Sequence, residues 1–296
     1  MEKEAAAEAP LHMGGLREET LTLVEIDETR NGWILTEASS LRTLRAVRYI
    51  TPFREGGSMP ALVEAEDSAL YVLKFSGAGQ GPLALVAELI GGEIARSLGL
   101  SVPELVLLEV DSQLGRNEPD AEIRDLLRAS IGTNLGMRFI EEATAFDLAT
   151  GDHCNAETAS AIVWLDAFLS NVDRTPRNPN LLMQRQQLYL IDHGAALYWQ
   201  HQWESRERGA LSGFPMIKDH ILLPWASALD EAAAKAAAVL HEAELTRIFA
   251  LVPDAWLARD GESAVSRRAE YVTLLTRRLQ STNFIEEAKA ARAKLI

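Results

Sequence analysis

The residue pattern of the chain changes near residue 145, and this change constrains the fold more than any other feature. Before it, short β-branched or aromatic segments such as Leu70–Phe75 alternate with turn residues, which is typical of strands. After it, apolar residues recur mainly at helical spacing, beginning with Glu157–Leu169. A chain that segregates strands from helices in this way belongs to the α+β class. We expect a ligand-binding cleft where the two halves meet.

The first half is predicted to form a meander of antiparallel strands with one helix. The expected strands are the segments 21–27, 32–38, 44–50, 59–66, 70–75, 102–111 and 134–143. The helix is expected over 82–100, and Gly99 marks its end.

The second half is predicted to be helical apart from one hairpin. The hairpin is expected at 180–184 and 187–192, and the later helices at 230–252, at 262–280 and in the Ala-rich tail. We therefore divide the chain into a flexible leader (1–15), a strand-rich N-terminal lobe (16–144) and a helical C-terminal lobe (145–296).

The acidic net charge of the chain argues against some classes of binding partner. Among 296 residues, 43 Asp and Glu outnumber 29 Lys and Arg, which gives a formal net charge of -14. A broad nucleic-acid or anionic-membrane surface needs positive potential, so we expect neither. No apolar run reaches about 18 residues and no signal-peptide pattern is present, so we expect no membrane insertion or export. The single cysteine, Cys154, fits a reducing compartment, and the cytoplasm is the expected location.

A proline-stiffened polar loop joins the first helix of the second half to the hairpin. It reads N-V-D-R-T-P-R-N-P-N, and Asn178 follows Asp173 by five positions. Asp192 comes fourteen positions later, where an apolar strand ends in Asp-His-Gly. Taken alone, Asp173 and Asn178 are typical of residues that cap a turn. Together with Asp192, they offer oxygen ligands for magnesium and a carboxylate near a nucleophile.

Two residues of the first half complete the set that phosphoryl transfer needs. Lys74 ends the strand-like Y-V-L-K-F, and Glu88 lies in the helix that follows. A lysine held by a carboxylate can orient phosphates, and catalysis of this transfer is mostly positioning and charge stabilisation. Glu93 is an alternative partner, but Glu88 lies nearer the helix start. As an alternative, Lys74 simply ends an edge strand with its stem over apolar surface.

In these residues the sequence resembles the HipA-like kinases, relatives of the protein-kinase and phosphatidylinositol-kinase superfamily. The resemblance spans about residues 44–203. It implies a two-lobed protein-kinase-like fold with an antiparallel β N-lobe and a mainly helical C-lobe. It also implies ATP and Mg²⁺ as cofactors and transfer of the γ-phosphoryl group to a hydroxyl acceptor. A protein Ser or Thr, including one of the protein's own, is favoured over a small molecule or lipid. An antitoxin-like protein partner is a further implication.

The resemblance implies a role for each position. Asp173 matches the catalytic aspartate that accepts or orients the proton of the attacking hydroxyl. Asn178 and Asp192 match the metal ligands of the family. Lys74 matches the lysine that contacts the α- and β-phosphates, and Glu88 matches its partner on the first helix.

The resemblance also implies a nucleotide site around these groups. The stretch R-E-G-G-S-M-P occupies the place of the phosphate-covering loop, where the amides of Gly56, Gly57 and Ser58 are expected to donate to phosphate oxygens. For Ser58 we favour a turn residue over a regulatory phosphorylation site. Phe139 and Ile140, near the connector between the halves, are candidates for the adenine wall.

Three positions depart from the protein-kinase pattern. The phosphate loop has two adjacent glycines rather than G-x-G-x-x-G, and the catalytic tripeptide is N-V-D rather than H-R-D. Both features suit the HipA and lipid-kinase branches, and Asn171 fits their N-x-D pattern. His193 replaces the phenylalanine of D-F-G, which brings into question any switch that depends on that ring.

Parts of the sequence are compatible with functions other than that of an active kinase. A pseudokinase or nucleotide-binding interaction module stays open, and so does transfer of AMP instead of phosphate. The run Gly77, Gly79, Gly81 after a strand suggests a dinucleotide fingerprint, but its G-x-G-x-G spacing and the following Pro82 do not fit one. The absence of G-K-[ST] excludes a P-loop. No histidine pair has the spacing of a zinc site, so we expect no transition metal.

Overall fold

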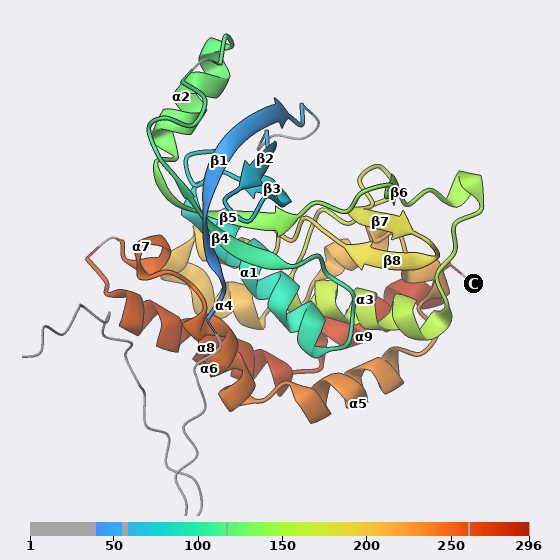
Figure 1. Cartoon of the computed structure of the whole chain (residues 1–296). Helices are drawn as coiled ribbons and strands as arrows, with labels where there is room; N and C mark the ends of the chain where they lie inside the picture. The colour runs from blue at the N-terminus through green and yellow to red at the C-terminus, as the bar shows by residue number, and fades with distance from the viewer. Residues whose placement is uncertain (1–39, 55–58, 117, 260, 296) are drawn as a thin grey trace, which may run out of the picture. The chain divides into compact units, whose positions relative to one another are not determined.

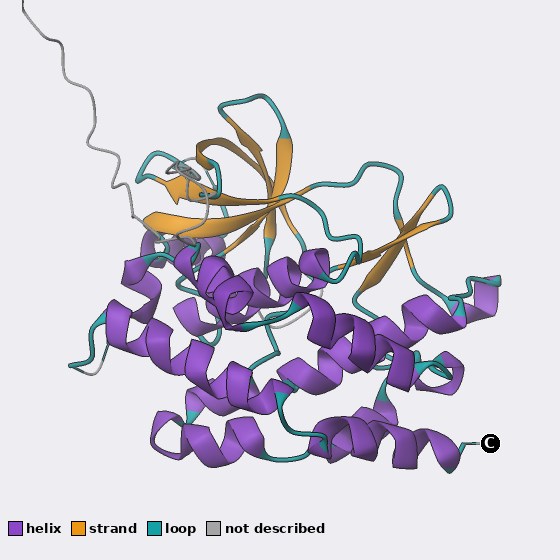
Figure 2. Ribbon diagram, turned by 90° about the horizontal axis from the view of Figure 1, so that it is seen from below, coloured by secondary structure: helices purple, strands orange, loops and turns teal. Residues whose placement is uncertain are grey.

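Strands and helices occupy opposite sides of the part of the chain that the structure describes. The structure is a computed structural model, and it describes residues 40–54, 59–116, 118–259 and 261–295. The expected leader (1–15) and the expected strands at 21–27 and 32–38 lie outside these residues. In the views of Figure 1 and Figure 2, the strands gather on one side and most helices on the other. The protein is therefore mixed α and β, with the strands first along the chain.

Five strands form a closed barrel in the order β1-β2-β3-β5-β4. The strands are β1 (Thr43–Pro52), β2 (Ala61–Ala65), β3 (Leu70–Lys74), β4 (Leu105–Val110) and β5 (Gly132–Arg138). Side chains alternate between the two faces of each strand, so Val63, Tyr71 and Leu73 are buried in the core of the barrel. The next residue along, Lys74, faces the other way.

The barrel closes through a parallel pair. Residues 43–45 of β1 pair in parallel with residues 107–109 of β4, whereas the other four pairings are antiparallel. The prediction of an antiparallel sheet is therefore wrong at this one pairing. Two strands and a helix separate β1 from β4 along the chain, and parallel neighbours need a long connection of this kind.

Helix α1 (Pro82–Ser97) connects the barrel to the helices. Pro82 begins it, where a missing N–H is tolerated, and Gly99 with φ +78° follows its end. Most of its residues are buried, and they share one core with the later helices and with Leu135 and Met137 of β5. This packing fixes α1 against both the barrel and the helical part.

Helix α2 (Ala121–Ala129) is absent from the sequence-based prediction. Asp120 caps it by accepting a hydrogen bond from the amide of Glu122 at 3.0 Å. Ile123 and Leu127 are buried in the core of the barrel, so α2 covers part of that core, and Figure 1 shows the helix far from the other helices. Its apolar residues Ile123, Leu126 and Leu127 stand at helical spacing, so the sequence carried a signal for this helix.

A second, small sheet holds the predicted hairpin. Its strands lie in the order β6-β7-β8 and are β6 (Thr144–Ala145), β7 (Leu181–Gln184) and β8 (Gln187–Leu190). The hairpin turn places Arg185 and Gln186 in the left-handed region. The amide of Leu190 donates to the carbonyl of Ser101 at 2.9 Å, which ties the end of the hairpin to the segment before β4.

The helical part is built around α3 (Ala156–Leu169), which is buried over most of its length. The remaining helices are α4 (Arg206–Leu211), α5 (Leu229–Val239), α6 (Glu242–Ala250), α7 (Asp254–Leu257), α8 (Ala264–Leu279) and α9 (Asn283–Ala293), with single 3₁₀ turns at Leu148–Thr150, Tyr198–His201, Trp203–Ser205, Pro215–Asp219 and Leu223–Trp225. None of the helices in the described ranges is long and apolar enough to cross a membrane.

The helix predicted over 230–252 is two helices. Leu240 and His241 have extended backbone between α5 and α6, and His241 Nδ1 accepts a hydrogen bond from the amide of Glu244 at 3.1 Å. The imidazole thus caps α6 as Ser or Asp would. A histidine in this role is easily read as an ordinary helix residue, which explains why the break went unpredicted.

Arg278 of α8 fixes the end of α3. Its buried guanidinium donates to the carbonyls of Phe168 and Ala167 at 2.6 and 2.9 Å, and also to that of Ala210. Burial lowers the pKa of Arg278 to about 10, so the group keeps its charge at neutral pH. The loop that contains Asp173 therefore starts from an anchored point.

Candidate active site

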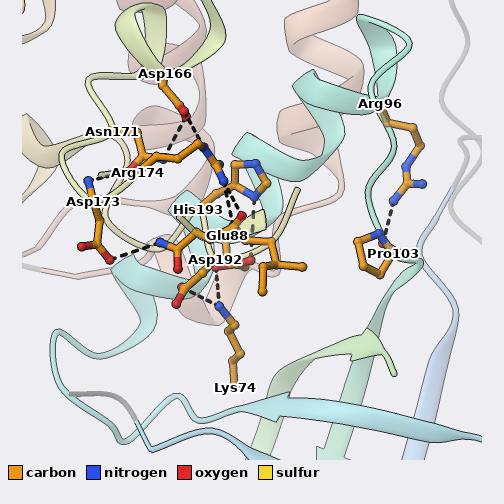
Figure 3. Close-up of polar contacts among 12 residues, drawn as sticks. Lys74, Glu88, Arg96, Pro103, Asp166, Asn171, Asp173, Arg174, Asp192 and His193 are labelled. Carbon is orange, nitrogen blue, oxygen red and sulfur yellow. Dashed lines mark hydrogen bonds and ion pairs between the residues drawn. The ribbon is translucent and has the colours of Figure 1, made fainter. Parts of the chain in front are cut away.

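Lys74, Glu88 and Asp192 meet at one point. Lys74 Nζ lies 2.8 Å from Glu88 Oε2 and 2.6 Å from Asp192 Oδ1 (Figure 3). Lys74 shares a strand face with Val72, which packs on the core of α1, and this alternation aims the lysine at the helix. Glu88 is fully buried, whereas the side chain of Asp192 is 44% exposed. The ammonium group therefore links the barrel, α1 and the loop after β8.

Burial and charge act on this group in opposite directions. Burial opposes the ionisation of Glu88, but the charge of Lys74 outweighs it and holds the pKa of Glu88 far below its usual value. Burial likewise disfavours the charged form of Lys74, yet Glu88 and Asp192 raise its pKa above the usual value. Glu88 is therefore ionised and Lys74 protonated at neutral pH, and the site presents a fixed cation.

Asp173 lies in the loop between α3 and β7 with its carboxylate held by two amides. Its Oδ2 accepts hydrogen bonds from Asn178 Nδ2 at 2.8 Å and from Asn180 Nδ2 at 3.3 Å. The amide of Asp173 donates to Asn171 Oδ1 at 3.2 Å. Its other carboxylate oxygen, Oδ1, accepts no hydrogen bond from the described residues.

Asp166 of α3 supports this loop from the protein interior. Its Oδ1 accepts from Asn171 Nδ2 at 2.9 Å, and its Oδ2 accepts from Arg174 Nε at 2.5 Å (Figure 3). The same Oδ2 also accepts from His220 Nε2 at 2.9 Å. His220 Nδ1 accepts from the amide of Leu222, which places the imidazole proton on Nε2. The carboxylate is thereby fully satisfied. Although burial opposes ionisation, Arg174 and then His220 hold the pKa of Asp166 far below its usual value.

Arg174 joins the loop of Asp173 to the loop of Asp192. Its Nη1 donates to the carbonyl of Asn180 at 2.5 Å and lies 3.4 Å from that of Ile191, the residue before Asp192. The amide of Ile191 donates to the same Asn180 carbonyl at 3.1 Å. One buried guanidinium therefore sets the position of both acidic loops.

Sequence reasoning missed this supporting network. Asp166 is the only charged residue in the run A-I-V-W-L-D-A-F-L, and a buried carboxylate requires a partner, so it offered a signal. Arg174 stands next to Asp173 and could have been proposed as that partner. His220 lies 54 residues after Asp166, and nothing in its neighbourhood points to the contact.

The Asp-His-Gly turn is strained and packed directly on α1. Asp192 has φ +56°, a conformation that costs energy in a residue other than glycine. The next residue, His193, is fully buried, and its side chain leaves no room for a side chain at Gly91. A Cβ at Gly91 would lie 2.6 Å from that of His193. Gly91 therefore permits the close contact between α1 and this turn.

The predicted phosphate-loop residues Gly56, Gly57 and Ser58 lie outside the described residues. Just before these residues, Arg54 Nη2 lies 3.1 Å from Asp120 Oδ2, and Asp120 is the residue that caps α2. The unpredicted helix therefore contacts the segment that directly follows β1. Arg54 is largely exposed, so the pair is solvated.

The structure decides between the two glutamates that the sequence offers as partners of Lys74. Glu93 pairs with Arg96 at 3.2 Å on α1, and Glu88 contacts the lysine. The two candidates for an adenine wall follow β5 directly. Phe139 and Ile140 are both half-buried, and the amide of Phe139 donates to the carbonyl of Leu70 on β3 at 2.9 Å.

The donor atoms suit a magnesium ion. Asp192 Oδ2 and Asn178 Oδ1 accept no hydrogen bond from the described residues, while Asp192 Oδ1 and Asn178 Nδ2 are engaged with Lys74 and Asp173. In the described part of the chain, no cluster of three or more His, Cys, Asp or Glu residues has the arrangement of a metal site. Magnesium is commonly held by one or two protein oxygens, water and phosphates, so the available oxygens fit it.

Comparison with known proteins identifies the family. A family model described as HipA-like kinase matches residues 46–288, which include most of the barrel, both acidic loops and most of the later helices. No curated protein matches the chain. The Helicobacter pylori proinflammatory kinase CtkA, a solved structure, is 15% identical, with a TM-score of 0.52 over 85% of this chain and 99% of that chain. This likeness concerns the fold, in which strands precede helices. The chain belongs to the HipA-like kinase family.

Proposed function

We propose that the protein is a two-lobed, ATP-dependent kinase that transfers the γ-phosphoryl group to the hydroxyl of a protein Ser or Thr, with its lobes divided near residue 145. The observation that carries the proposal is the convergence of Lys74 on Glu88 and Asp192. Burying a charged lysine among carboxylates is costly, and such arrangements cluster at functional sites. Membership of a kinase family supports phosphate binding as the use of this cation.

The chain's residues divide the work of the reaction. Lys74, held by Glu88, orients the α- and β-phosphates, and the amides of the loop at Gly56, Gly57 and Ser58 cover them. Phe139 and Ile140 line the adenine. These assignments follow from the family pattern, and the contact of Lys74 with Glu88 supports the first of them.

Asp192 and Asn178 would hold magnesium through the oxygens that are free in the structure. The ion neutralises charge on the phosphates when it is bound. The strained backbone of Asp192 fits this role, because strain of this kind persists where the surrounding structure fixes a functional group.

Asp173 orients the acceptor hydroxyl and receives its proton. Asn178 and Asn180 hold one oxygen of its carboxylate, which leaves the other for the hydroxyl. Pro176, Arg177 and Asn178 are exposed, so a polypeptide can reach this loop from solvent. This access supports a protein acceptor. We place the reaction in the cytoplasm because the only cysteine, Cys154, is an unpaired thiol. An antitoxin-like partner stays a prediction.

The test is intact-mass analysis after incubation with Mg²⁺ and ATP. We expect a phosphoryl-sized gain on the protein or on an added protein mixture. Asp173→Asn and Asp192→Asn should abolish the gain, whereas Asp219→Asn, an exposed surface change, should leave it intact. Binding of a non-hydrolysable ATP analogue is measured in parallel on all four proteins.

Other outcomes separate the alternatives. An adenylyl-sized gain would replace the proposal with AMP transfer. Magnesium-dependent nucleotide binding without any transfer would indicate a pseudokinase or a nucleotide-binding interaction module. A protein that binds no nucleotide would overturn the proposed site.

A further inference from the structure

His193 and Glu88 are buried polar groups that lack a complete set of hydrogen bonds. Both side chains are fully buried. Glu88 Oε1 and both ring nitrogens of His193 have no hydrogen-bond partner among the described residues. His193 Nδ1 lies 3.8 Å from Glu88 Oε1, which is beyond hydrogen-bonding distance (Figure 3). Buried polar groups are nearly always partnered, so two facing groups without partners require an explanation.

The packing of the imidazole restricts the possible partners. Gly91 lies three positions after Glu88, on the same face of α1, and contacts the side chain of His193 at its base. This contact holds the ring against the helix. Among the described residues, Glu88 Oε1 is the one carboxylate oxygen that lies within 4 Å of a ring nitrogen of His193. A small rotation of the imidazole or of the carboxylate would let Nδ1 approach Glu88 Oε1 to hydrogen-bonding distance.

The sharing of Lys74 indicates when that approach matters. In the structure, Lys74 Nζ contacts Glu88 and Asp192 together. Under the proposed function, Asp192 serves the metal and Lys74 turns to the phosphates, so Glu88 must hold the lysine without help. Among the described residues, Glu88 is anchored by hydrogen bonds to Oε2 alone, and a carboxylate anchored through one oxygen can rotate. A second donor at Oε1 would fix it.

We propose that His193 is a positioning residue that donates a hydrogen bond from Nδ1 to Glu88 Oε1 when the nucleotide site is loaded. The inference rests on the proposed function and deepens it. A neutral imidazole suffices, because only an N–H is needed. His193 thereby couples the position of the Asp192 loop to α1. A phenylalanine at this position would not provide such a polar connection.

The experiment measures the affinity for a non-hydrolysable ATP analogue with Mg²⁺. His193→Phe keeps a ring but removes the donor, and should weaken binding about tenfold, as expected for a lost hydrogen bond to a charged group. His193→Asn places an amide donor near the Nδ1 position and should restore most of the affinity. The ATP KM of His193→Phe should rise more than its kcat falls.

A double-mutant cycle separates positioning from general packing. In a Glu88→Ala background, His193→Phe should change affinity by less than about twofold, because the acceptor is gone. An undiminished effect in that background, or unchanged affinity of His193→Phe alone, would overturn the inference. If the wild type binds no analogue, the proposed function fails and this inference fails with it.

A measurement on the native side chain covers the case in which His193→Phe fails to fold. Protein labelled with ¹⁵N-histidine is examined by NMR before and after addition of the analogue and Mg²⁺. A protected Nδ1–H signal of His193 should appear, and His220→Asn distinguishes it from the other buried histidine. A His193 proton that stays on Nε2 after loading would contradict the proposal.

Discussion

Arg174 Nε lies 2.5 Å from Asp166 Oδ2, and both side chains are fully buried. The pair connects α3 to the loop of Asp173, and Arg174 also reaches toward the carbonyl of Ile191, the residue before Asp192. The two acidic residues that we propose to act in catalysis are therefore positioned by the same guanidinium group.

Breaking the buried pair should destabilise the protein strongly. Arg174→Met leaves Asp166 with a charge that, among the described side chains, His220 and Asn171 alone contact. We expect a loss of about 3–5 kcal/mol in the free energy of unfolding, measured by urea denaturation. Asp125→Asn is the control, because it breaks an ion pair whose partners are 75% and 72% exposed. That change should stay within about 0.5 kcal/mol. Equal effects of the two substitutions would contradict this account.

Removing Lys74 should change how stability depends on pH. In the wild type the pKa of Glu88 is depressed, so its contribution is present above the usual value of 4.5 and is lost as pH falls. In Lys74→Met, burial dominates and raises the pKa of Glu88, so stability is lost as pH rises. The difference in unfolding free energy between the two proteins should therefore widen from pH 4.5 upward. Lys218→Met, at an exposed pair, should show a constant difference.

His220 should make the protein less stable in mild acid. Burial lowers the pKa of this imidazole below its usual 6.5, although Asp166 opposes the shift. The unfolded chain then takes up a proton first as the pH falls below 6.5, so stability declines there. One proton corresponds to at most about 1.4 kcal/mol per pH unit. His220→Asn should flatten the fall in unfolding free energy between pH 7 and 5 relative to the exposed control His153→Gln. Parallel curves would exclude His220 as the cause.

Replacing Asp173 should affect turnover and spare nucleotide binding. Asp173→Asn keeps the size of the side chain but removes the proton acceptor, so kcat should fall about 10²- to 10⁴-fold. The affinity for a non-hydrolysable ATP analogue should stay within about twofold of the wild type, because Lys74 and Glu88 are unchanged. Steady-state kinetics measure kcat, and calorimetry measures the affinity for the analogue. An equal loss in both quantities would point to a collapsed loop.

Local patterns made part of the site predictable. Lys74 ends a short alternating strand and Glu88 lies near the start of the next helix, so both were placed from the period of their own elements. The hairpin that delivers Asp192 was likewise visible in the alternation on either side of its turn. These features depend on residues a few positions apart, which a single sequence displays.

Features that depend on distant residues were not predictable in the same way. The parallel pairing of β1 with β4 joins residues about 60 positions apart, and periodicity carries no information on which strands pair. The contact of His220 with Asp166 likewise joins residues that are far apart in the sequence, here by 54 positions. Asp166 and Arg174 differ, because a lone carboxylate in an apolar helix signals a buried partner. Arg174 adjoins the N-x-D motif and shows no separate pattern of its own, which obscures its role as the partner of Asp166.

The closure of the barrel limits how a polypeptide acceptor can bind. All five of its strands have neighbours on both sides, although residues 46–52 of β1 pair with β2 alone and leave that stretch open on its other side. Among the described strands, free edges remain in the sheet β6-β7-β8, whose last strand leads directly into Asp192. A polypeptide acceptor that extended the small sheet at β8 would lie beside the loop of Asp192.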